Sequence, residues 1–165
     1  MARPRTFDED KVMEAIKNVF WNYGYEGTSY ADLIDASGLH KGSLYAAFGD
    51  KRALYIEALR HYDEQEIAQA VDLLTKGQGA RIESLFNAVI DAVKIYKDLR
   101  GCLLCNAAID QAKHNKDVEK SVSLGIQRML NALIQALQDQ HKHISNVEQS
   151  ASHMCSVYFL SLIHI

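Results

Sequence analysis

The large apolar side chains of this chain recur mainly every three or four positions, which is the spacing of helices that bury one face. The first such stripe consists of Val12, Ile16, Val19, Phe20 and Tyr23. Residues 6–9 (Thr-Phe-Asp-Glu), just before it, have the spacing of a capping box, and Gly24 follows it as a helix stop. We therefore expect an amphipathic helix that follows a short arm and ends at Gly24.

Two short helices joined by a tight turn are predicted next. Thr28 or Ser29 can cap the first of them, over residues 30–37, because a short hydroxyl side chain accepts a hydrogen bond from an unpaired amide. Gly38 can adopt the positive φ that ends a helix at little cost, and a second helix is expected over 41–48. The expected core residues here are Leu33, Ile34, Leu39, Leu44 and Phe48. This layout is that of a helix-turn-helix, whose second helix enters a DNA major groove.

The remainder of the chain is also helical in pattern. A helix capped by Asp50 is expected to keep its rhythm until the Gly-Gln-Gly break at 77–79. Further helical segments follow over 81–96, 102–113, 118–140 and from about Asn146 onward. The apolar stripe of 118–140 is broad enough to pack on more than one neighbour. No β-rich stretch competes, so we predict an all-α fold in which a helical bundle follows the helix-turn-helix.

Composition narrows the class of protein. The chain has 165 residues, one proline and three cysteines. Three cysteines do not make a disulfide framework, so we expect a reducing, cytoplasmic setting. No signal peptide and no membrane-spanning apolar run are recognisable, which favours a soluble protein.

The net charge of −3 argues at first against a nucleic-acid partner, but the position of the charges matters more than their sum. Residues 1–52 carry seven Lys or Arg and eight Asp or Glu. Arg3 and Arg5 lie on the arm before the first helix. Lys41 and Lys51 each begin one of the later helices. Because a helix N-terminus attracts phosphate, these lysines are well placed to contact a nucleic-acid backbone.

The helix-turn-helix region resembles a known family signature. The matching residues are 24–29, 36–39 and 41–45, with Ile34, Phe48, Lys51 and Leu54. They are similar to the N-terminal signature of the tetracycline repressor (TetR) family and cover roughly the first third of the chain. The resemblance implies a three-helix DNA-binding head at 1–52 and a helical-bundle body at 53–165 for ligand binding and dimerisation.

The same resemblance implies a bacterial one-component transcriptional regulator, by family default a repressor. Such a protein binds a palindromic operator in double-stranded DNA as a homodimer held by its C-terminal helices, and a small-molecule effector releases it. No catalytic residue, metal or cofactor is implied. Family members usually have one more helix at the end, so the last helix is expected to be missing from this chain.

Two positions depart from the family pattern. His40 stands where a hydroxyl residue is common, and a neutral histidine is a weaker helix cap. Ala47 stands where a histidine is common, which removes one possible phosphate contact. Tyr45, Lys51 and Thr28 are therefore the expected contacts with backbone phosphates.

The second short helix is expected to read the base edges. Lys41 can donate to guanine O6 and N7, Ser43 to a base or a phosphate, and the small Gly42 permits a close approach. Arg3 and Arg5 are expected in an adjoining minor groove. The predicted DNA-binding residues are Arg3, Arg5, Thr28, His40, Lys41, Gly42, Ser43, Tyr45 and Lys51.

The segment 100–106 (Arg-Gly-Cys-Leu-Leu-Cys-Asn) stands out in the body. Cys102 and Cys105 share a helix face, and a helix N-terminus beside Arg100 can lower a thiol pKa, so a redox or electrophile sensor is one interpretation. Packing is the simpler interpretation, because cysteine is often a small buried apolar residue, and metal binding with His114 is a third. The residues expected around a ligand pocket are Phe86, Tyr96, Cys102, Cys105, Asn106, Ile109 and Met129.

Two other classes of function remain open. A cysteine-dependent enzyme needs a base and an oxyanion site beside Cys102 or Cys105, and the sequence has no accompanying motif. A helical interaction module without DNA binding is compatible with the near-neutral head. Salt-sensitive binding to a palindromic duplex separates the regulator from both.

Overall fold

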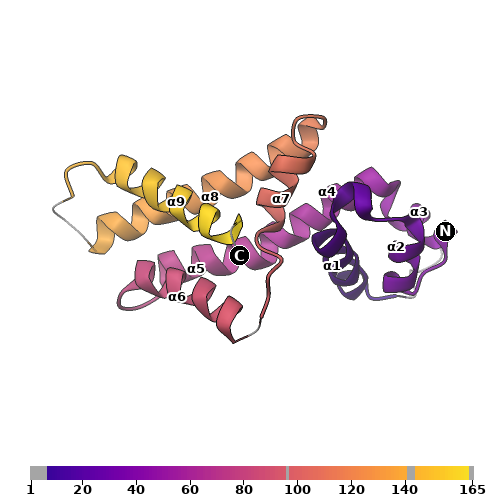
Figure 1. Cartoon of the computed structure of the whole chain (residues 1–165), viewed down its shortest axis with the longest axis horizontal. Helices are drawn as coiled ribbons and strands as arrows, with labels where there is room; N and C mark the ends of the chain where they lie inside the picture. Colours follow the sequence, from indigo (N-terminus) through magenta and orange to yellow (C-terminus); the bar gives the residue numbers. More distant parts are fainter. Residues whose placement is uncertain (1–6, 96, 141–143, 164–165) are drawn as a thin grey trace, which may run out of the picture. The chain divides into compact units, whose positions relative to one another are not determined.

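The computed structural model describes residues 7–95, 97–140 and 144–163 (Figure 1). All regular secondary structure in these ranges is helical, as the sequence predicts. Within the same ranges, no helix has both the length and the apolar character needed to cross a bilayer. Contacts between residues divide the chain into two compact units, 1–61 and 62–165, so the first unit extends beyond the expected boundary at residue 52.

The first unit contains α1 (Glu9–Gly27), α2 (Tyr30–Ser37), α3 (Lys41–Phe48) and most of α4 (Lys51–Tyr62). Asp8 caps α1 by accepting a hydrogen bond from the Lys11 amide at 3.2 Å. The capping residue is thus Asp8, two positions after the expected Thr6, which lies outside the described residues. Gly24 interrupts α1 with a φ of 69°, at the predicted helix end.

Ser29, and not Thr28, caps α2. The Ser29 hydroxyl accepts from the Asp32 amide at 3.2 Å, and the Asp32 carboxylate accepts from the Ser29 amide at 2.7 Å. Thr28 is buried and donates its hydroxyl to the Gly24 carbonyl at 2.7 Å. Gly38 then ends α2 in the left-handed conformation, with a φ of 67°. The tight turn of the predicted helix-turn-helix is therefore present.

The core of the first unit draws on all four of its helices. Its large, fully buried apolar side chains include Ile16, Phe20, Leu33, Leu44, Leu54, Tyr55 and Leu59. Of the predicted core, Leu33 and Leu44 are fully buried. The other three, Ile34, Leu39 and Phe48, are only half-buried. Both short helices therefore hold to the core mainly through one leucine each.

Tyr23 does not belong to this core, contrary to the sequence prediction. Its side chain is 62% exposed. The stripe ends at Phe20, and the break at Gly24 redirects the chain so that Tyr25 packs there, with the two rings stacked at 6.4 Å between centroids. Extending the apolar spacing of α1 as far as the glycine break therefore predicts one buried residue too many.

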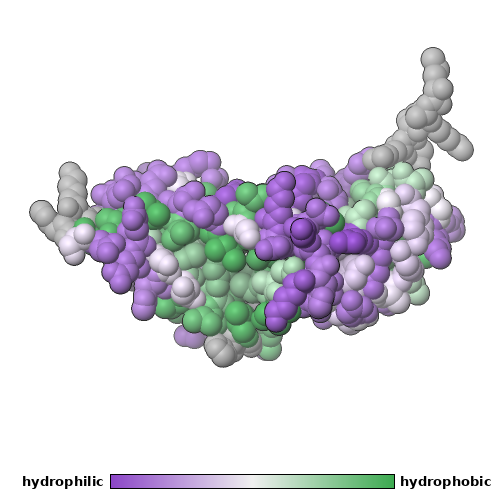
Figure 2. Space-filling model, turned by 90° about the horizontal axis from the view of Figure 1, so that it is seen from above, coloured by the Kyte–Doolittle hydropathy of each residue, from purple (hydrophilic) through white to green (hydrophobic). Residues whose placement is uncertain are grey.

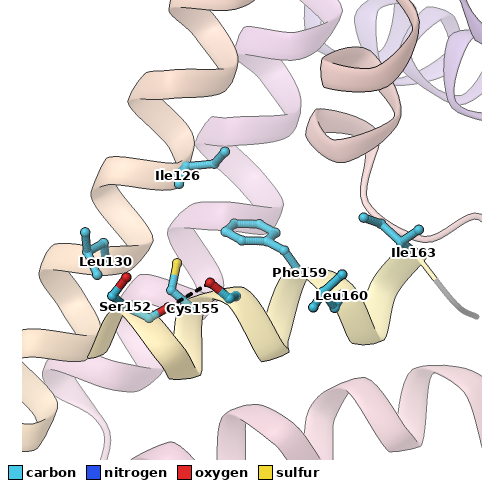
Figure 3. Close-up of a pocket in the computed structure, with 8 residues that line it drawn as sticks. Ile126, Leu130, Ser152, Cys155, Phe159, Leu160 and Ile163 are labelled. Carbon is cyan, nitrogen blue, oxygen red and sulfur yellow. Dashed lines mark hydrogen bonds between the residues drawn. The ribbon is translucent and has the colours of Figure 1, made fainter. Parts of the chain in front are cut away.

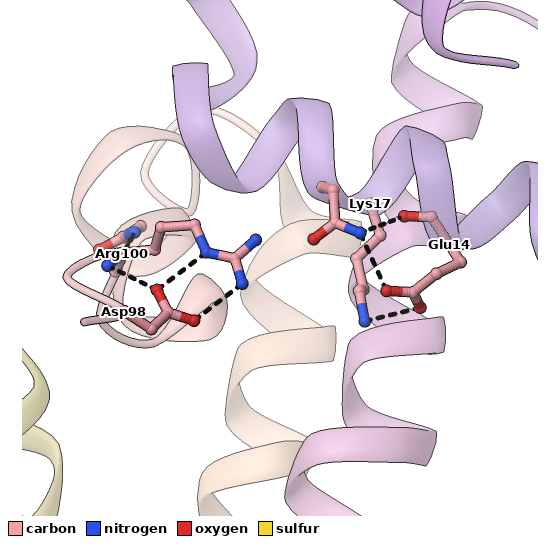
Figure 4. A network of polar contacts seen from close by, with 6 residues as sticks. Glu14, Lys17, Asp98 and Arg100 are labelled. Atoms are coloured by element: carbon pink, nitrogen blue, oxygen red, sulfur yellow. Dashed lines mark hydrogen bonds and ion pairs between the residues drawn. The ribbon is translucent and has the colours of Figure 1, made fainter. Parts of the chain in front are cut away.

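A buried lysine is the main polar feature of α1. Lys17 is 1% exposed, and its ammonium group lies 2.8 Å from the Glu14 carboxylate (Figure 4). Glu14 also accepts from the Asn18 amide group at 2.9 Å and lies 3.2 Å from Nε2 of His61 on α4. Partial burial raises the pKa of Glu14, but its hydrogen bond with Lys17 and the attraction of that charge lower the pKa overall. This cluster ties α1 to α4.

The second unit follows the end of α4. Its elements are the π-helical turn η1 (Asp63–Ile67), α5 (Ala68–Lys76), α6 (Arg81–Lys94), α7 (Leu103–Asp110), α8 (Lys116–Gln140) and α9 (Val147–Ile163). The helix expected to run unbroken from Asp50 to the glycine break is thus two α-helices with η1 between them. Asn146 accepts from the Gln149 amide at 3.1 Å, which places the start of α9 where the sequence predicts it.

Helix α8 is the central helix of the second unit and packs against α5, α7 and α9 (Figure 1). Its buried residues are Val118, Val122, Gly125, Met129, Ala132, Leu133, Ala136 and Leu137. Gly125 permits a close approach, because a Cβ there would lie 2.4 Å from a Leu104 methyl carbon. One turn later Arg128 pairs with Asp63 of η1. At the outer edge of the predicted stripe, Ile126 stays 37% exposed.

Candidate nucleic-acid interface

Helix α3 presents its first turn to solvent. Lys41, Gly42 and Ser43 are exposed, whereas Leu44 behind them is fully buried. His40 occupies the cap position with an extended backbone, and its exposed side chain makes no capping hydrogen bond. The leading end of α3 therefore combines a cation, a hydroxyl and the partial positive charge of a helix N-terminus.

Two stacked tyrosines support this end of α3. The rings of Tyr30, at the start of α2, and Tyr45, on α3, lie 5.3 Å apart at an angle of 27°. The Lys41 ammonium group lies 5.2 Å from the centre of the Tyr30 ring and 5.8 Å from that of Tyr45. Both distances are within the range of cation–π attraction. The tyrosine pair therefore favours one position of the Lys41 side chain at the exposed end of α3.

The hydroxyl groups of the pair join α2, α3 and α4. The Tyr30 hydroxyl accepts a hydrogen bond from the Lys51 amide at 3.1 Å. A hydrogen bond between the Tyr30 and Tyr45 hydroxyls raises the pKa of Tyr45 to about 12. The Tyr45 hydroxyl therefore donates its proton to the Tyr30 oxygen within this pair.

A second lysine, Lys51, lies at the N-terminus of α4. Asp50 caps this helix by accepting from the Ala53 amide at 2.8 Å. The Lys51 ammonium group lies 4.5 Å from the centre of the Tyr25 ring. Two amides of α4, those of Lys51 and Ala53, thus donate within the protein instead of being available to a phosphate. The Lys51 side chain carries the expected contact.

The predicted DNA-binding residues fall into three groups. His40, Lys41, Gly42, Ser43, Tyr45 and Lys51 lie together around the first turn of α3 and the start of α4. Thr28 is only 2% exposed and its hydroxyl is engaged by Gly24, so its side chain is not presented to a phosphate. Arg3 and Arg5 lie outside the described residues.

Sequence reasoning missed Tyr30. It is the residue that holds Tyr45, Lys41 and the Lys51 amide in one cluster. Its only mark in the sequence is an aromatic ring at the first position of a short helix. The stacking with Tyr45 depends on the angle between α2 and α3, which local spacing does not reveal.

A family model described as bacterial regulatory proteins, tetR family, matches residues 12–58. The matched range includes all of α2 and α3 and most of α1 and α4. The helix-turn-helix head of this chain therefore matches the TetR family. Its exposed α3 and the supporting tyrosine pair are thus features of a TetR-type head.

Similar proteins of known name support the same assignment. An uncharacterised helix-turn-helix transcriptional regulator of Bacillus subtilis, YezE, is 31% identical over 73% of this chain and 63% of its own length. The repressor ComR of Escherichia coli is 28% identical over 73% of this chain and 59% of its own length. The chain thus spans about three fifths of the length of these curated relatives.

Solved structures match over nearly the whole chain. A cysteine mutant of the TetR family regulator CifR, in complex with a 26-base-pair operator duplex, is 29% identical and has a TM-score of 0.83, covering 98% of this chain and 88% of that one. The reduced form of Escherichia coli NemR has the same TM-score at 17% identity, covering 94% of this chain and 86% of its own. The second match shows the fold alone.

The residues predicted to surround a ligand differ in their exposure and in their contacts. Cys102, Cys105 and Met129 are buried, and Ile109 is 67% exposed. The Asn106 side chain donates to the Arg100 carbonyl at 3.1 Å. Phe86 contacts the Tyr158 ring, with centroids 6.3 Å apart. Tyr96 lies outside the described residues.

An open apolar groove of about 450 Å³ lies elsewhere, between α8 and α9 (Figure 3). Its lining residues are Ile126, Leu130, Ser152, Cys155, Ser156, Phe159, Leu160 and Ile163. None of the predicted ligand residues lines it. The groove is therefore a candidate surface that the sequence did not indicate as a ligand site.

Apolar side chains also gather on one face of the second unit in the view of Figure 2. The large apolar side chains of α8 and α9 that remain exposed are Leu124, Ile126, Val157, Leu160 and Ile163, at 37–55%. A set of this kind on neighbouring helices marks a surface that can bury itself against a partner.

Proposed function

We propose that this protein is a DNA-binding transcriptional regulator that represses by occupying a palindromic operator as a homodimer. The observation that carries the proposal is the exposed first turn of α3, where Ser43 is exposed and Lys41 lies over the tyrosine pair. An α-helix fits the major groove, and exposed donors on its first turn can reach base edges. Its activity is binding, without catalysis, in the cytoplasm.

Each exposed group in the head has an expected role. Lys41 donates to guanine O6 and N7, and Ser43 contacts a base or a phosphate. Gly42 lets α3 approach the bases closely, and His40 lies beside the DNA at the start of α3. Tyr45 and Lys51 bind backbone phosphates, which fixes the register without reading sequence. Tyr30 touches no DNA in this scheme and acts as a positioning residue. Arg3 and Arg5 extend the contacts into a minor groove.

The homodimer is proposed to form through α8 and α9. Their exposed apolar side chains supply the kind of surface that is buried between subunits. A two-fold axis through this surface gives two copies of α3, and a palindromic operator matches that symmetry. The two reading helices should therefore contact half-sites about one duplex turn apart, or a multiple of that distance.

Release by a small-molecule effector completes the proposal. The residues expected around the effector from the sequence stay a prediction. The effector acts if it binds one arrangement of the two heads better than the other, because a ligand shifts an equilibrium only by its differential affinity.

Selection of duplexes from a random library tests the function. The protein should enrich palindromic sequences, and its affinity for them should fall steeply with salt, because each phosphate contact releases counterions. The variant Lys51→Ala, which removes one phosphate contact, should reduce the salt dependence by about one phosphate-equivalent. A library with no enriched sequence, or binding that is insensitive to salt, overturns the proposal in favour of a protein-interaction module.

A further inference from the structure

Two cysteines at the start of α7 form a thiol pair. Cys102 is the cap residue of α7, with an extended backbone, and is fully buried. Cys105 lies on the first turn of the helix and is 7% exposed. The neighbouring Gly101 and Asn106 are only half-buried, so the pair lies just beneath the surface.

The thiol pair is linked by hydrogen bonds to a tyrosine of another helix. A hydrogen bond with the Cys105 thiol lowers the pKa of Cys102 against the opposing effect of burial, and the Tyr62 hydroxyl lowers it further. The hydrogen bond with Cys102, together with burial, raises the pKa of Cys105. Cys102 is therefore the residue of the pair that becomes a thiolate first, and Cys105 keeps its proton.

Tyr62 connects this pair to α4 and η1. It is the last residue of α4, is buried, and directly precedes the π-helical turn η1. The next residue, Asp63, pairs with Arg128 of α8. A π-helical turn is a deviation from α-helical geometry that recurs at functional sites. The chemical state of Cys102 can therefore act on α4 and η1 through a single hydroxyl group.

We propose that Cys102 and Cys105 are a reversible dithiol that a hydroperoxide oxidises to a disulfide, and that Tyr62 transmits the change to α4. This inference rests on the proposed function for its regulatory meaning, but its chemistry can be tested without DNA. The arrangement follows the general pattern of a reactive thiol at a helix N-terminus with a second thiol one turn away.

The oxidation proceeds in two balanced steps. The Cys102 thiolate attacks one peroxide oxygen, the O–O bond breaks, and a sulfenic acid forms at Cys102 while hydroxide leaves and is protonated to water. The Cys105 sulfur then attacks the Cys102 sulfur. The S–S bond forms, the S–O bond breaks, and the departing hydroxide takes the Cys105 proton as water. The peroxide is reduced and the two thiols are oxidised.

The disulfide removes the partner of the Tyr62 hydroxyl. A thiolate is a good acceptor for a hydrogen bond, whereas a disulfide sulfur is a poor one. Losing this acceptor weakens the hold on the Tyr62 hydroxyl, and we expect α4 and η1, which Tyr62 joins, to respond. Oxidation should therefore loosen the segment 62–67.

The third cysteine provides a matched control. Cys155, on α9, is also buried, and burial raises the pKa of its thiol. It is not at a helix N-terminus, since α9 begins at Val147. The structure therefore distinguishes a reactive pair at α7 from a buried thiol of similar exposure on α9.

Peptide mass spectrometry of the full chain after treatment with hydrogen peroxide tests the chemistry. We expect a peptide with a Cys102–Cys105 disulfide, lighter by two hydrogens and restored by a dithiol reductant. Cys155→Ser should give the same disulfide. Tyr62→Phe should slow its formation about fivefold at neutral pH, because losing a hydrogen bond to the charged sulfur raises the thiol pKa by about one unit. Absence of the disulfide in the unsubstituted protein, or a Cys105–Cys155 linkage in its place, overturns the proposal.

Hydrogen exchange of the same samples tests the transmission. Amides of 62–67 should exchange faster in the oxidised protein than in the reduced one, and Cys105→Ser should abolish the difference. Identical exchange in both states refutes the role of Tyr62. Affinity for a duplex selected by the reduced protein should fall at least fivefold on oxidation, and unchanged affinity refutes the regulatory role. If no duplex is selected at all, the proposed function fails, while the disulfide and the exchange data still decide this inference.

Discussion

Substitution of Gly42 by alanine separates the stability of the head from its contact with DNA. Gly42 is the second residue of α3 and has no positive φ. A Cβ at this position meets no heavy atom within 4 Å. The fold therefore does not require glycine there. If Gly42 has a role, the role belongs to whatever approaches α3 from outside.

The expected effects of Gly42→Ala on folding stability and on DNA affinity have opposite signs. Alanine in place of a helical glycine stabilises by about 0.5–1 kcal/mol, which raises Tm by about 1–4 °C in a chain of this size. The added methyl group separates α3 from the base edges. Loss of one good base contact costs about 1–3 kcal/mol, so Kd should rise roughly fivefold to a hundredfold.

The assay pairs thermal unfolding with titration of a selected duplex at fixed salt. Gly27→Ala is the matched control, because Gly27 is exposed on α1 and its added Cβ would meet the Tyr23 Cβ at an ordinary 3.6 Å. The control should keep the affinity of the unsubstituted protein. If Gly42→Ala is at least as stable as the unsubstituted protein and binds the duplex equally well, α3 does not approach the bases closely and the reasoning is refuted.

Three further substitutions test other parts of the account. Tyr30→Phe should weaken binding about threefold to tenfold on all duplexes alike, since it removes hydrogen bonds of about 0.5–1.5 kcal/mol that hold the phosphate-binding groups; a gel-shift series with unchanged affinity would contradict the positioning role. Glu14→Gln leaves Lys17 buried without its carboxylate and should lower the free energy of unfolding by about 1–3 kcal/mol at neutral pH. Because the folded pKa of Glu14 is below its unfolded value, this stabilisation is present above the unfolded pKa and is lost as pH falls through the folded one. Urea unfolding should therefore show a smaller difference at about pH 3 than at neutral pH, and an equal difference would count against the ion pair. Leu160→Asp should convert a dimer to a folded monomer in sedimentation experiments, and a persistent dimer would exclude the α9 surface.

The helices of the head could be predicted because their limits are set locally. Gly24 and Gly38 break helices through their own backbone angles, and Ser29 caps α2 through a residue three positions later. Such signals depend on a few neighbouring residues. The sequence therefore placed the turn between α2 and α3 correctly.

The parts that failed depend on how helices pack. Thr28 and Ser29 are equivalent as caps in the sequence, but the break at Gly24 turns Thr28 inward and leaves Ser29 to cap the helix. Tyr30 meets Tyr45 only because α2 and α3 pack against each other across the turn at Gly38. The periodicity of apolar residues does not reveal this packing.

The exposure of the expected ligand residues was the least predictable part of the body. Met129 and Ile109 both fit an apolar pocket by residue type, yet one is fully buried and the other is 67% exposed. The open groove instead combines Ile126 of α8 with Phe159 and Leu160 of α9. Its formation depends on the pairing of two helices that are distant in sequence.

The most direct test of the central claim is the base preference of Lys41→Ala compared with that of the unsubstituted protein, measured by selection from the same random library. If the first turn of α3 reads the major groove, the variant should lose its preference at one base pair in each half-site, most directly a guanine, and keep the rest of the palindrome. An unchanged preference at every position would show that Lys41 does not read the operator and would contradict the account.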